Sequence, residues 1–349
     1  MKIKQLVALA TAALMLTACG AKTNNNDNNN NNNNNKAVAT DSQKPKGEGL
    51  KVVTTTYILR DLTQEIAGDK ATVTCLIPKG QGVHGFEPSP KDMNQVNEAD
   101  LFIYNGAGLE SFTDRFKETT EGDATFVEAS EGIELLKGGH HHHHDEDADH
   151  DHDHDAADHD HDHDAAEHDH EHDAAEHDHE HEGMDPHVWM SPENAEEMAK
   201  NICEALSAKD PDNAAFYKAN YEKLSEKFDA LNDSFEKVLS KAKYKDIVVS
   251  HEAYGYLAKE FGLNQIPIEG INSESEPDPK AMKTIVDEMK AKGIKTVFTE
   301  PHEDDKIAQT IASEAGAQVK ELDPMEYESD KNYFERMESN LKTLESALQ

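Results

Sequence analysis

The chain is poor in cysteine, with only three such residues in 349 positions. Apart from Cys19 near the amino terminus, only Cys75 and Cys203 could form a disulfide. Because Cys75 falls in an expected strand and Cys203 on an expected helix, we predict two buried free thiols. The folded part also lacks a CxxC pair, a P-loop and a GxSxG sequence. His251 begins an HE pair, but the fifth position is Gly255, so the HExxH motif of zinc proteases is absent.

Basic residues are scarce too, with 34 Lys and Arg against 71 Asp and Glu, and the formal net charge is −37. The 19 acidic residues of a His-rich tract at 140–182 account for part of this charge, and the remaining −18 is still strongly acidic. Such a surface repels nucleic acids and anionic lipid headgroups, which argues against both as partners. The charge favours a cationic ligand or a basic protein partner.

Long hydrophobic runs are missing as well. The apolar run Leu6–Leu16 follows two lysines and is too short to span a bilayer as a permanent helix. It ends in the sequence LTAC, which resembles the lipobox of bacterial lipoproteins, with cleavage before Cys19 and acylation of its thiol. The alternative is an ordinary secretory peptide with an incidental cysteine. We expect a lipoprotein signal peptide at residues 1–18 and a lipid anchor at Cys19, outside the cytoplasmic membrane.

What the chain does have is a run of 43 positions, residues 140–182, made only of His, acidic residues and Ala. It contains 17 of the 21 histidines, 19 acidic residues and 7 alanines, and from His150 it repeats with a period of nine. Almost nothing in it can be buried, so we expect a disordered, solvated loop. Imidazoles beside carboxylates favour a divalent metal such as zinc. The alternatives are an acidic spacer, or a cloning tag at 140–144, although tags are placed at chain termini.

Residues 19–49 contain an Asn-rich stretch and are expected to form a flexible stalk. Beyond it, apolar patterns typical of strands and helices alternate on both sides of one long expected helix, Asn213–Lys241. This alternation predicts an α/β fold with two parallel-sheet lobes that are covered by helices and joined by the long helix. The expected segments are an amino-terminal lobe at 50–139, the end of that lobe with the linking helix at 183–243, and a carboxy-terminal lobe at 244–349.

Four histidines lie outside the tract. His84, His251 and His302 each follow an expected strand, and His187 precedes the first helix after the tract. A lone loop histidine is usually a solvated surface residue. However, parallel α/β folds bind ligands beyond the carboxyl ends of their strands, so these histidines are candidate metal ligands.

Five motifs stand in order: HGFEPSPKD at His84, DPHVWMSP at Asp185, HEAYGYLAKEFGL at His251, FTEP at Phe298 and LDPMEYES at Leu322. Through them the chain from Lys51 to Gln349 resembles the zinc branch of the metal-binding (cluster A-I) solute-binding proteins of bacterial ABC importers, the ZnuA-like and AdcA-like lipoproteins. The resemblance implies two lobes joined by a rigid long helix, with one Zn²⁺ held between them for delivery to a membrane permease.

By motif position, the resemblance implies His84, His187 and His251 as nitrogen ligands. Related manganese importers carry a carboxylate in place of His251, so a histidine there favours zinc. The fourth ligand stays open. Some zinc members use a Glu at the position of Glu326, manganese members use an Asp at the position of Asp323, and other members have water.

Three further residues flank these positions. Glu300 in FTEP is interpreted as a carboxylate that orients a histidine through its free ring nitrogen, with a surface acid as the alternative. His302 has no counterpart in the family, so we expect it at the surface. Val83 stands where the family often has Pro, which would loosen the His84 loop without removing the ligand.

The sequence favours an extracellular zinc-binding component of an ABC transporter, a lipid-anchored monomer and not an enzyme. A surface metal buffer or adhesin, in which the tract is the functional part, is the main alternative. A secreted zinc hydrolase would need an open coordination position beside a general base, and no such arrangement is readable. Affinity for one metal ion that survives deletion of the tract would separate the first function from the second.

Overall fold

The structure of the protein is a computed structural model that describes residues 49–139, 183–271 and 277–349. These residues belong to one compact unit that begins at Gly47. The expected signal peptide, Cys19, the stalk up to residue 48 and the His-rich tract lie outside the described residues and stay predictions.

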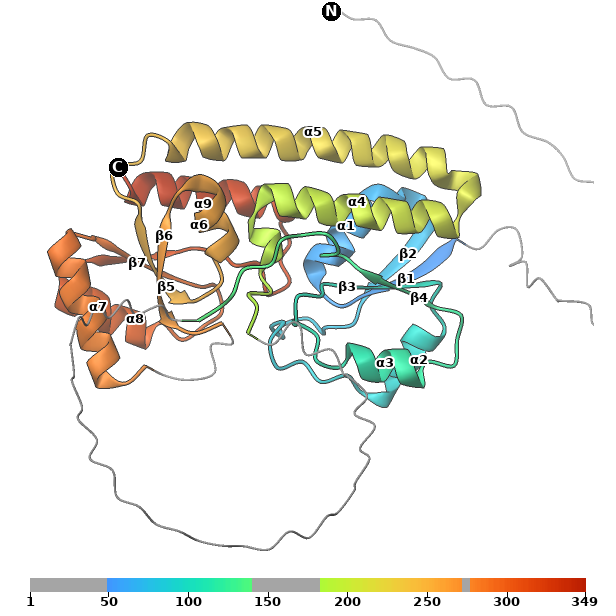
Figure 1. The fold of residues 1–349 in the computed structure, drawn as a ribbon, viewed down its shortest axis with the longest axis horizontal. Helices are drawn as coiled ribbons and strands as arrows, with labels where there is room; N and C mark the ends of the chain where they lie inside the picture. Colours follow the sequence, from blue (N-terminus) through green and yellow to red (C-terminus); the bar gives the residue numbers. More distant parts are fainter. Residues whose placement is uncertain (1–48, 140–182, 272–276) are drawn as a thin grey trace, which may run out of the picture. The chain divides into compact units, whose positions relative to one another are not determined.

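Two four-stranded sheets form the framework of the described residues, and every strand pairing within them is parallel. The strand order is β2-β1-β3-β4 in the amino-terminal lobe and β6-β5-β7-β8 in the carboxy-terminal lobe. The expected α/β fold with two parallel-sheet lobes is therefore confirmed (Figure 1). The strands are β1 (Leu50–Thr54), β2 (Ala71–Cys75), β3 (Leu101–Tyr104), β4 (Thr125–Glu128), β5 (Asp246–His251), β6 (Asn264–Glu269), β7 (Thr296–Thr299) and β8 (Gln318–Glu321).

The apolar sequences of the central strands explain this arrangement. Both β3 (LFIY) and β7 (TVFT) are buried at every position, as expected for parallel strands with helices on both faces. In each sheet the second strand is added on one side of the first and the third on the other side. Ligands bind beyond the carboxyl ends of the strands at such a reversal, which here means the ends of β1 and β5.

Helices surround both sheets, and local signals set where several of them begin. Ser191 caps α4 by accepting a hydrogen bond from the N–H of Asn194, with Pro192 in the first turn. Asn332 and Glu335 form a capping box at the start of α9. The helices are α1 (Tyr57–Ala67), α2 (Pro90–Asn97), α3 (Thr113–Thr119), α4 (Pro192–Lys209), α5 (Ala214–Leu239), α6 (Gly255–Phe261), α7 (Pro279–Lys292), α8 (Lys306–Ala315) and α9 (Tyr333–Ala347), with 3₁₀ turns at Gly68–Lys70, Val188–Met190 and Pro211–Asn213.

Helix α5 joins the two lobes. Its 26 residues span about 39 Å at the usual rise per residue, and the expected helix over Asn213–Lys241 agrees to within two residues at each end. It packs against α1 and α4 of the amino-terminal lobe and against α6 and α9 of the carboxy-terminal lobe (Figure 1). Its buried residues recur every three, four or seven positions, at Tyr217, Leu224, Phe228, Leu231, Phe235 and Leu239.

One hydrophobic core runs through both lobes, from Leu50 in β1 to Leu348 beyond α9. On α5 the ring of Phe228 contacts Tyr333 at 5.5 Å between centroids, and Phe235 stacks on Phe261 at 5.0 Å. A smaller core lies around α7, α8 and the second sheet. The lobes are therefore held together by packed apolar side chains as well as by covalent linkage.

Two findings concern the expectations for individual residues. The helix expected at Glu110–Lys117 begins three residues later, because the Glu110 carboxylate accepts hydrogen bonds from the N–H groups of Asn105 and Gly106 in the turn after β3. Cys75 and Cys203 are free thiols as expected, although Cys75 is only partly buried.

Among the described helices, none has both the length and the apolar character needed to cross a membrane.

Candidate metal centre

His84 reaches the space between the lobes from the loop between β2 and α2. Val83 and Phe86 are buried on either side of it, and the Phe86 ring packs against Phe112 at 5.8 Å. We expected Val83 to loosen the His84 loop, but the burial of the Val83 side chain opposes this effect. The His84 side chain is 13% exposed, which makes it the most accessible member of the cluster described below.

His187 is completely buried, just before the 3₁₀ turn that leads into α4. Asp185 fixes its ring, because Oδ1 of Asp185 accepts hydrogen bonds from the His187 backbone N–H (3.0 Å) and from Nδ1 (2.7 Å). Since the carboxylate can only accept, Nδ1 carries the proton on that side, and Nε2 faces the cluster. The segment is also held by both lobes: Asn105 Nδ2 donates to the carbonyl of Pro186 (3.0 Å), and Tyr256 Oη donates to the carbonyl of Asp185 (2.8 Å).

His251 is the last residue of β5 and is buried. Its Nδ1 bonds to Oε1 of Glu300, which also accepts a hydrogen bond from the Ser250 hydroxyl at 2.8 Å. Glu300 thus lies behind His251, where a carboxylate fixes the ring orientation and directs Nε2 into the cluster.

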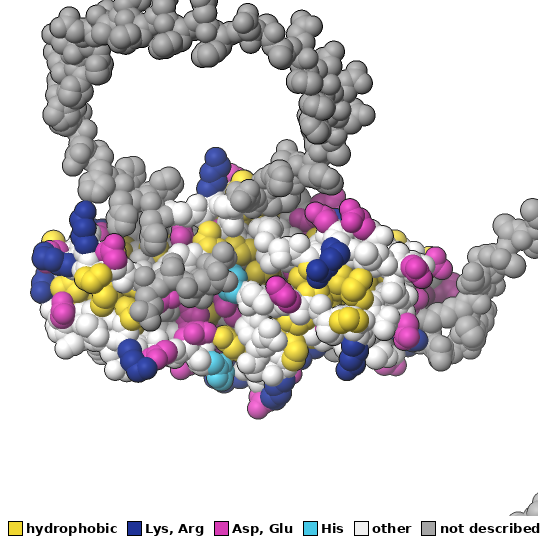
Figure 2. All heavy atoms as spheres, turned by 90° about the horizontal axis from the view of Figure 1, so that it is seen from below, with side chains coloured by type: hydrophobic (Ala, Val, Ile, Leu, Met, Phe, Trp, Pro, Cys, Tyr) yellow, Lys and Arg dark blue, Asp and Glu magenta, His cyan; other side chains and the backbone are white. Residues whose placement is uncertain are grey.

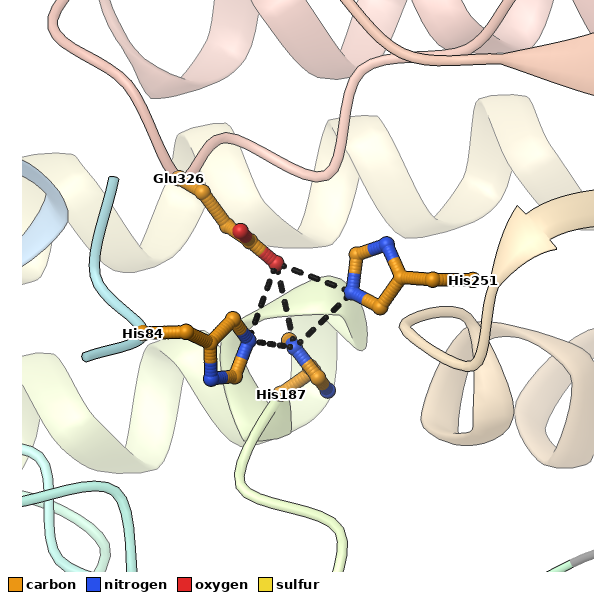
Figure 3. A group of neighbouring side chains, drawn as sticks. All are labelled: His84, His187, His251 and Glu326. Atoms are coloured by element: carbon orange, nitrogen blue, oxygen red, sulfur yellow. Dashed lines mark hydrogen bonds and ion pairs between the residues drawn. The ribbon is translucent and has the colours of Figure 1, made fainter. Parts of the chain in front are cut away.

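Glu326 comes from the loop between β8 and α9 and is buried. Its Oε1 lies 3.3 Å from Nε2 of His84, 3.1 Å from Nε2 of His187 and 3.0 Å from Nε2 of His251. Nε2 of His187 is also 3.0 Å from that of His84 and 3.4 Å from that of His251. Figure 3 shows the four side chains converging on one point from different segments of the chain.

These spacings fit the chemistry of a tetrahedral metal. Zinc bonds of about 2.0–2.1 Å in a tetrahedron place neighbouring donor atoms about 3.3 Å apart. Five of the six donor pairs in this cluster lie between 3.0 and 3.4 Å. Three imidazole nitrogens and one carboxylate oxygen also form a donor set that zinc prefers.

The carboxylates around the site shift the pKa values of two of its histidines. Burial alone would lower the pKa of His251, but the hydrogen bonds that its ring donates to Glu300 and Glu326 outweigh burial and raise the pKa to about 10. For His187, bonds with Asp185 and Glu326 likewise outweigh burial and raise the pKa. Burial would raise the pKa of Glu326, but its bonds with the histidines hold that pKa well below the usual range.

The remaining candidates lie outside the four-residue cluster. Asp323 forms a two-pronged pair with Arg336, at 2.7 Å to Nε and 2.7 Å to Nη2, and accepts the N–H of Met325 at 2.8 Å. The Asp323 carboxylate is therefore paired with Arg336 and does not belong to the cluster.

His302 is exposed, and its ring contacts Tyr327 at 5.3 Å between centroids. Little histidine surface shows on the face in Figure 2, which accords with the burial of His187 and His251.

The sequence analysis missed the residues that orient His187. Asp185 stood in the DPH motif without a role, although a carboxylate two residues before a histidine is a local signal that could have indicated one. Asn105 and Tyr256 gave no such signal, because they lie 81 and 71 residues away in sequence from the carbonyls that they bind.

Gly255 offers a direct test of the Asp185 contact. A Cβ at this position would lie 2.6 Å from Oδ2 of Asp185, too close for the carboxylate to keep its place. We expect Gly255→Ala to weaken zinc binding at least about tenfold, as loss of an outer-shell partner does, since His187 loses its orientation. Competitive titration with a zinc indicator measures this. The matched control is Gly270→Ala, whose Cβ meets nothing within 4 Å; equal affinities of the two variants would contradict the assigned role.

Two lobes around a cluster of metal-binding side chains are the architecture of a solute-binding protein that takes up a metal ion. Residues 52–347 match the family model described as "ZnuA: Zinc-uptake complex component A periplasmic", so the chain belongs to this family. The family consists of extracytoplasmic zinc-binding components of ABC uptake systems and not of enzymes.

Individual relatives agree with the family match. The chain is 35% identical over 314 residues to the high-affinity zinc uptake system protein ZnuA of Bacillus subtilis (strain 168), over 88% of this chain and 90% of that protein. It is 35% identical over 313 residues to the zinc-binding protein AdcA of Streptococcus pyogenes serotype M6, over 87% of this chain but only 57% of that longer protein.

Solved structures share the fold. The Zn(II)-bound ZnuA-like domain of Streptococcus pneumoniae AdcA superposes with a TM-score of 0.68 at 28% identity, over 86% of this chain and 99% of that one. The laminin-binding protein Lmb of Streptococcus agalactiae, described as a bifunctional protein with adhesin and metal transporting activity, gives 0.70 at 30% identity, over 86% of this chain and 100% of that one.

Proposed function

We propose that this chain captures one Zn²⁺ outside the cytoplasmic membrane with His84, His187, His251 and Glu326, and delivers it to the permease of an ABC importer. The observation that supports this most strongly is the donor spacing of 3.0–3.4 Å, which matches the edge of a zinc tetrahedron. The carboxylates of Asp185 and Glu300 behind two of the histidines are the outer-shell partners that metal-bound imidazoles require.

The donor set favours zinc over manganese. Three imidazoles form a softer site than the mixed carboxylate sets that Mn²⁺ prefers. Glu326 supplies the only carboxylate in the cluster, because Asp323 is paired with Arg336. We therefore assign the fourth ligand to Glu326.

We also propose that acylated Cys19 anchors the mature protein, as a monomer, to the outer face of the cytoplasmic membrane. The lipobox-like end of the first apolar run supports this. So does the 31% identity over 314 residues to a protein of Streptococcus pneumoniae that is named zinc-binding lipoprotein AdcA.

The His-rich tract is proposed to bind further zinc ions weakly and to raise their concentration near the tight site. The residues that flank it are hydrogen-bonded to each other: Gly138 N–H donates to the Gly183 carbonyl at 2.9 Å, and Lys137 pairs with Met184 in an antiparallel bridge. Deletion of residues 140–182 would therefore leave a short Gly-rich turn, which such a bridge accommodates.

We expect this deletion to remove the weak zinc ions and to leave one tight zinc ion with its affinity changed by less than a few-fold. Metal-content analysis and zinc titration of the intact and deleted proteins measure both classes of site. In a bacterium that depends on the protein, growth should slow only when zinc is scarce. Loss of the tight ion in the deleted protein would overturn the proposed four-residue site and favour a metal buffer or adhesin built on the tract.

A further inference from the structure

An ion cluster crosses between the lobes beside the candidate metal centre. Nη1 of Arg60, on α1 of the amino-terminal lobe, lies 2.9 Å from Oε1 of Glu328, in the loop between β8 and α9 of the carboxy-terminal lobe. Nζ of Lys79 lies 3.4 Å from the other oxygen of Glu328.

Two members of this cluster are close in sequence to two of the proposed ligands. Glu328 is two residues after Glu326, and Lys79 is in the same loop as His84. Both ligands are on loops rather than on strands or helices, so the backbone hydrogen bonds of regular structure do not fix them. A contact between the two loops therefore sets how firmly His84 and Glu326 face each other.

Arg60 is itself well fixed. Its Nε and Nη2 donate to Oδ1 of Asp61 at 3.0 and 2.9 Å, and its guanidinium lies over the ring of Tyr57 at 5.1 Å. The side chains of Arg60 and Glu328 are only 25% and 22% exposed, so water screens their attraction less than at an open surface.

The residue between Glu326 and Glu328 packs against the His84 loop as well. A Cβ on Gly82 would lie 3.1 Å from the Cζ and Oη atoms of Tyr327, so only a glycine leaves this ring its full space. The Tyr327 hydroxyl donates to Oε1 of Glu303 at 2.5 Å, which holds the ring in position. The two ligand loops thus meet through an aromatic contact and an ion cluster side by side.

We infer that Arg60, Glu328 and Lys79 are positioning residues that hold the Glu326 loop to the amino-terminal lobe, through Arg60 on α1 and Lys79 in the His84 loop, and that they slow the release of the bound metal. This inference rests on the proposed zinc site. None of the three residues is a metal ligand, and their effect passes through the loops that carry the ligands.

The decisive experiment compares Glu328→Gln with Arg60→Met in the full chain, with Zn²⁺ as the probe. The rate at which the tight zinc ion passes to an excess of chelator is measured, along with the zinc affinity. Removing a negative charge near a cation weakens its binding by Coulomb attraction alone, whereas removing a positive charge strengthens it. If the cluster acts by positioning, both variants should release zinc faster, by about three- to tenfold, the size expected for a partly buried ion pair.

Three further proteins complete the test. Glu65→Gln is the matched control: it removes the same charge from a pair that also involves α1, Lys227 with Glu65 at 3.0 Å, but away from both ligand loops. It should release zinc at the wild-type rate. Arg60→Lys keeps the charge and should recover most of the wild-type rate. The double variant Arg60→Met/Glu328→Gln should release zinc no faster than the worse single variant, because both remove one shared interaction.

Slower zinc release from Arg60→Met than from the wild type would overturn the inference and leave a purely electrostatic effect. Wild-type release rates in both single variants, each with an unchanged melting temperature of the metal-free protein, would overturn it too. A wild-type protein without any slowly released zinc would instead contradict the proposed function. The two failures are therefore distinguishable.

Discussion

Replacing His187 with alanine is expected to weaken the tight zinc site by more than about 100-fold, the upper end of the cost of losing an outer-shell partner. His187 holds a central place in the cluster: like Oε1 of Glu326, its Nε2 lies within 3.4 Å of the donor atoms of all three other residues. Without it, zinc loses a preorganised ligand and cannot complete its tetrahedron with protein atoms. His84→Ala and His251→Ala should also weaken binding strongly.

Competitive titration of these variants in the tract-deleted protein measures the effect without interference from weak sites. His302→Ala is the control, because His302 is exposed and lies outside the cluster. Its affinity should stay within about twofold of wild type, as is usual for surface substitutions. Unchanged zinc affinity in all three ligand variants would refute the assigned site. The melting temperature of each metal-free variant shows whether it is folded.

Zinc binding at pH 7 is expected to release protons, and the affinity should rise about tenfold per pH unit for each proton released. With its pKa raised to about 10, His251 is protonated at pH 7 in the metal-free protein. The pKa of His187 is raised as well. A metal-bound imidazole presents a lone pair at Nε2, so the proton there must leave before the bond forms. The affinity therefore falls as the pH falls, by about 100-fold from pH 8 to pH 6 if one proton is displaced throughout.

Calorimetric titrations in two buffers with different ionisation enthalpies count the released protons at pH 7. The tract must be absent, because its histidines also exchange protons for zinc. Glu300→Gln is an informative companion: it removes the carboxylate that contributes most to the raised pKa of His251, so the proton count should decrease. Zinc binding without proton release, and with the same affinity at pH 6 and pH 8, would contradict this charge balance.

The sequence was sufficient for most of the fold. The apolar runs of strands such as β3 and β7, and the helical spacing along α5, are local patterns, and the structure has the expected elements there. The predicted start of α3 at Glu110 was wrong, because the Glu110 carboxylate accepts hydrogen bonds from the N–H groups of Asn105 and Gly106 in the preceding turn. No local pattern separates that use of a glutamate from a place in the first helical turn.

The candidate site was predicted from patterns of two kinds. Histidines at the ends of parallel strands indicated candidates, and the order of the motifs indicated which of them to combine. These patterns did not indicate whether Asp323 or Glu326 joins the three histidines. The proposal of Glu326 depends on Arg336, 13 residues after Asp323 in the chain, which binds the Asp323 carboxylate. The turn between the two acids also needs Met325 at a φ of 66°, a conformation that its residue type does not indicate.

The hydrophobic core that runs through both lobes has a consequence for the lifetime of the protein. Because this larger core is shared by both lobes, unfolding of either lobe exposes apolar surface of the other, so we expect the described residues to unfold together. A metal ion bound at the junction then lowers the population of the unfolded chain everywhere, by about 100-fold at a free zinc concentration 100 times the dissociation constant. Proteases that cut only unfolded segments would find the loaded protein resistant along its whole length and the empty protein more vulnerable. Under severe zinc deprivation the carrier would thus be degraded faster than when it is supplied with its cargo.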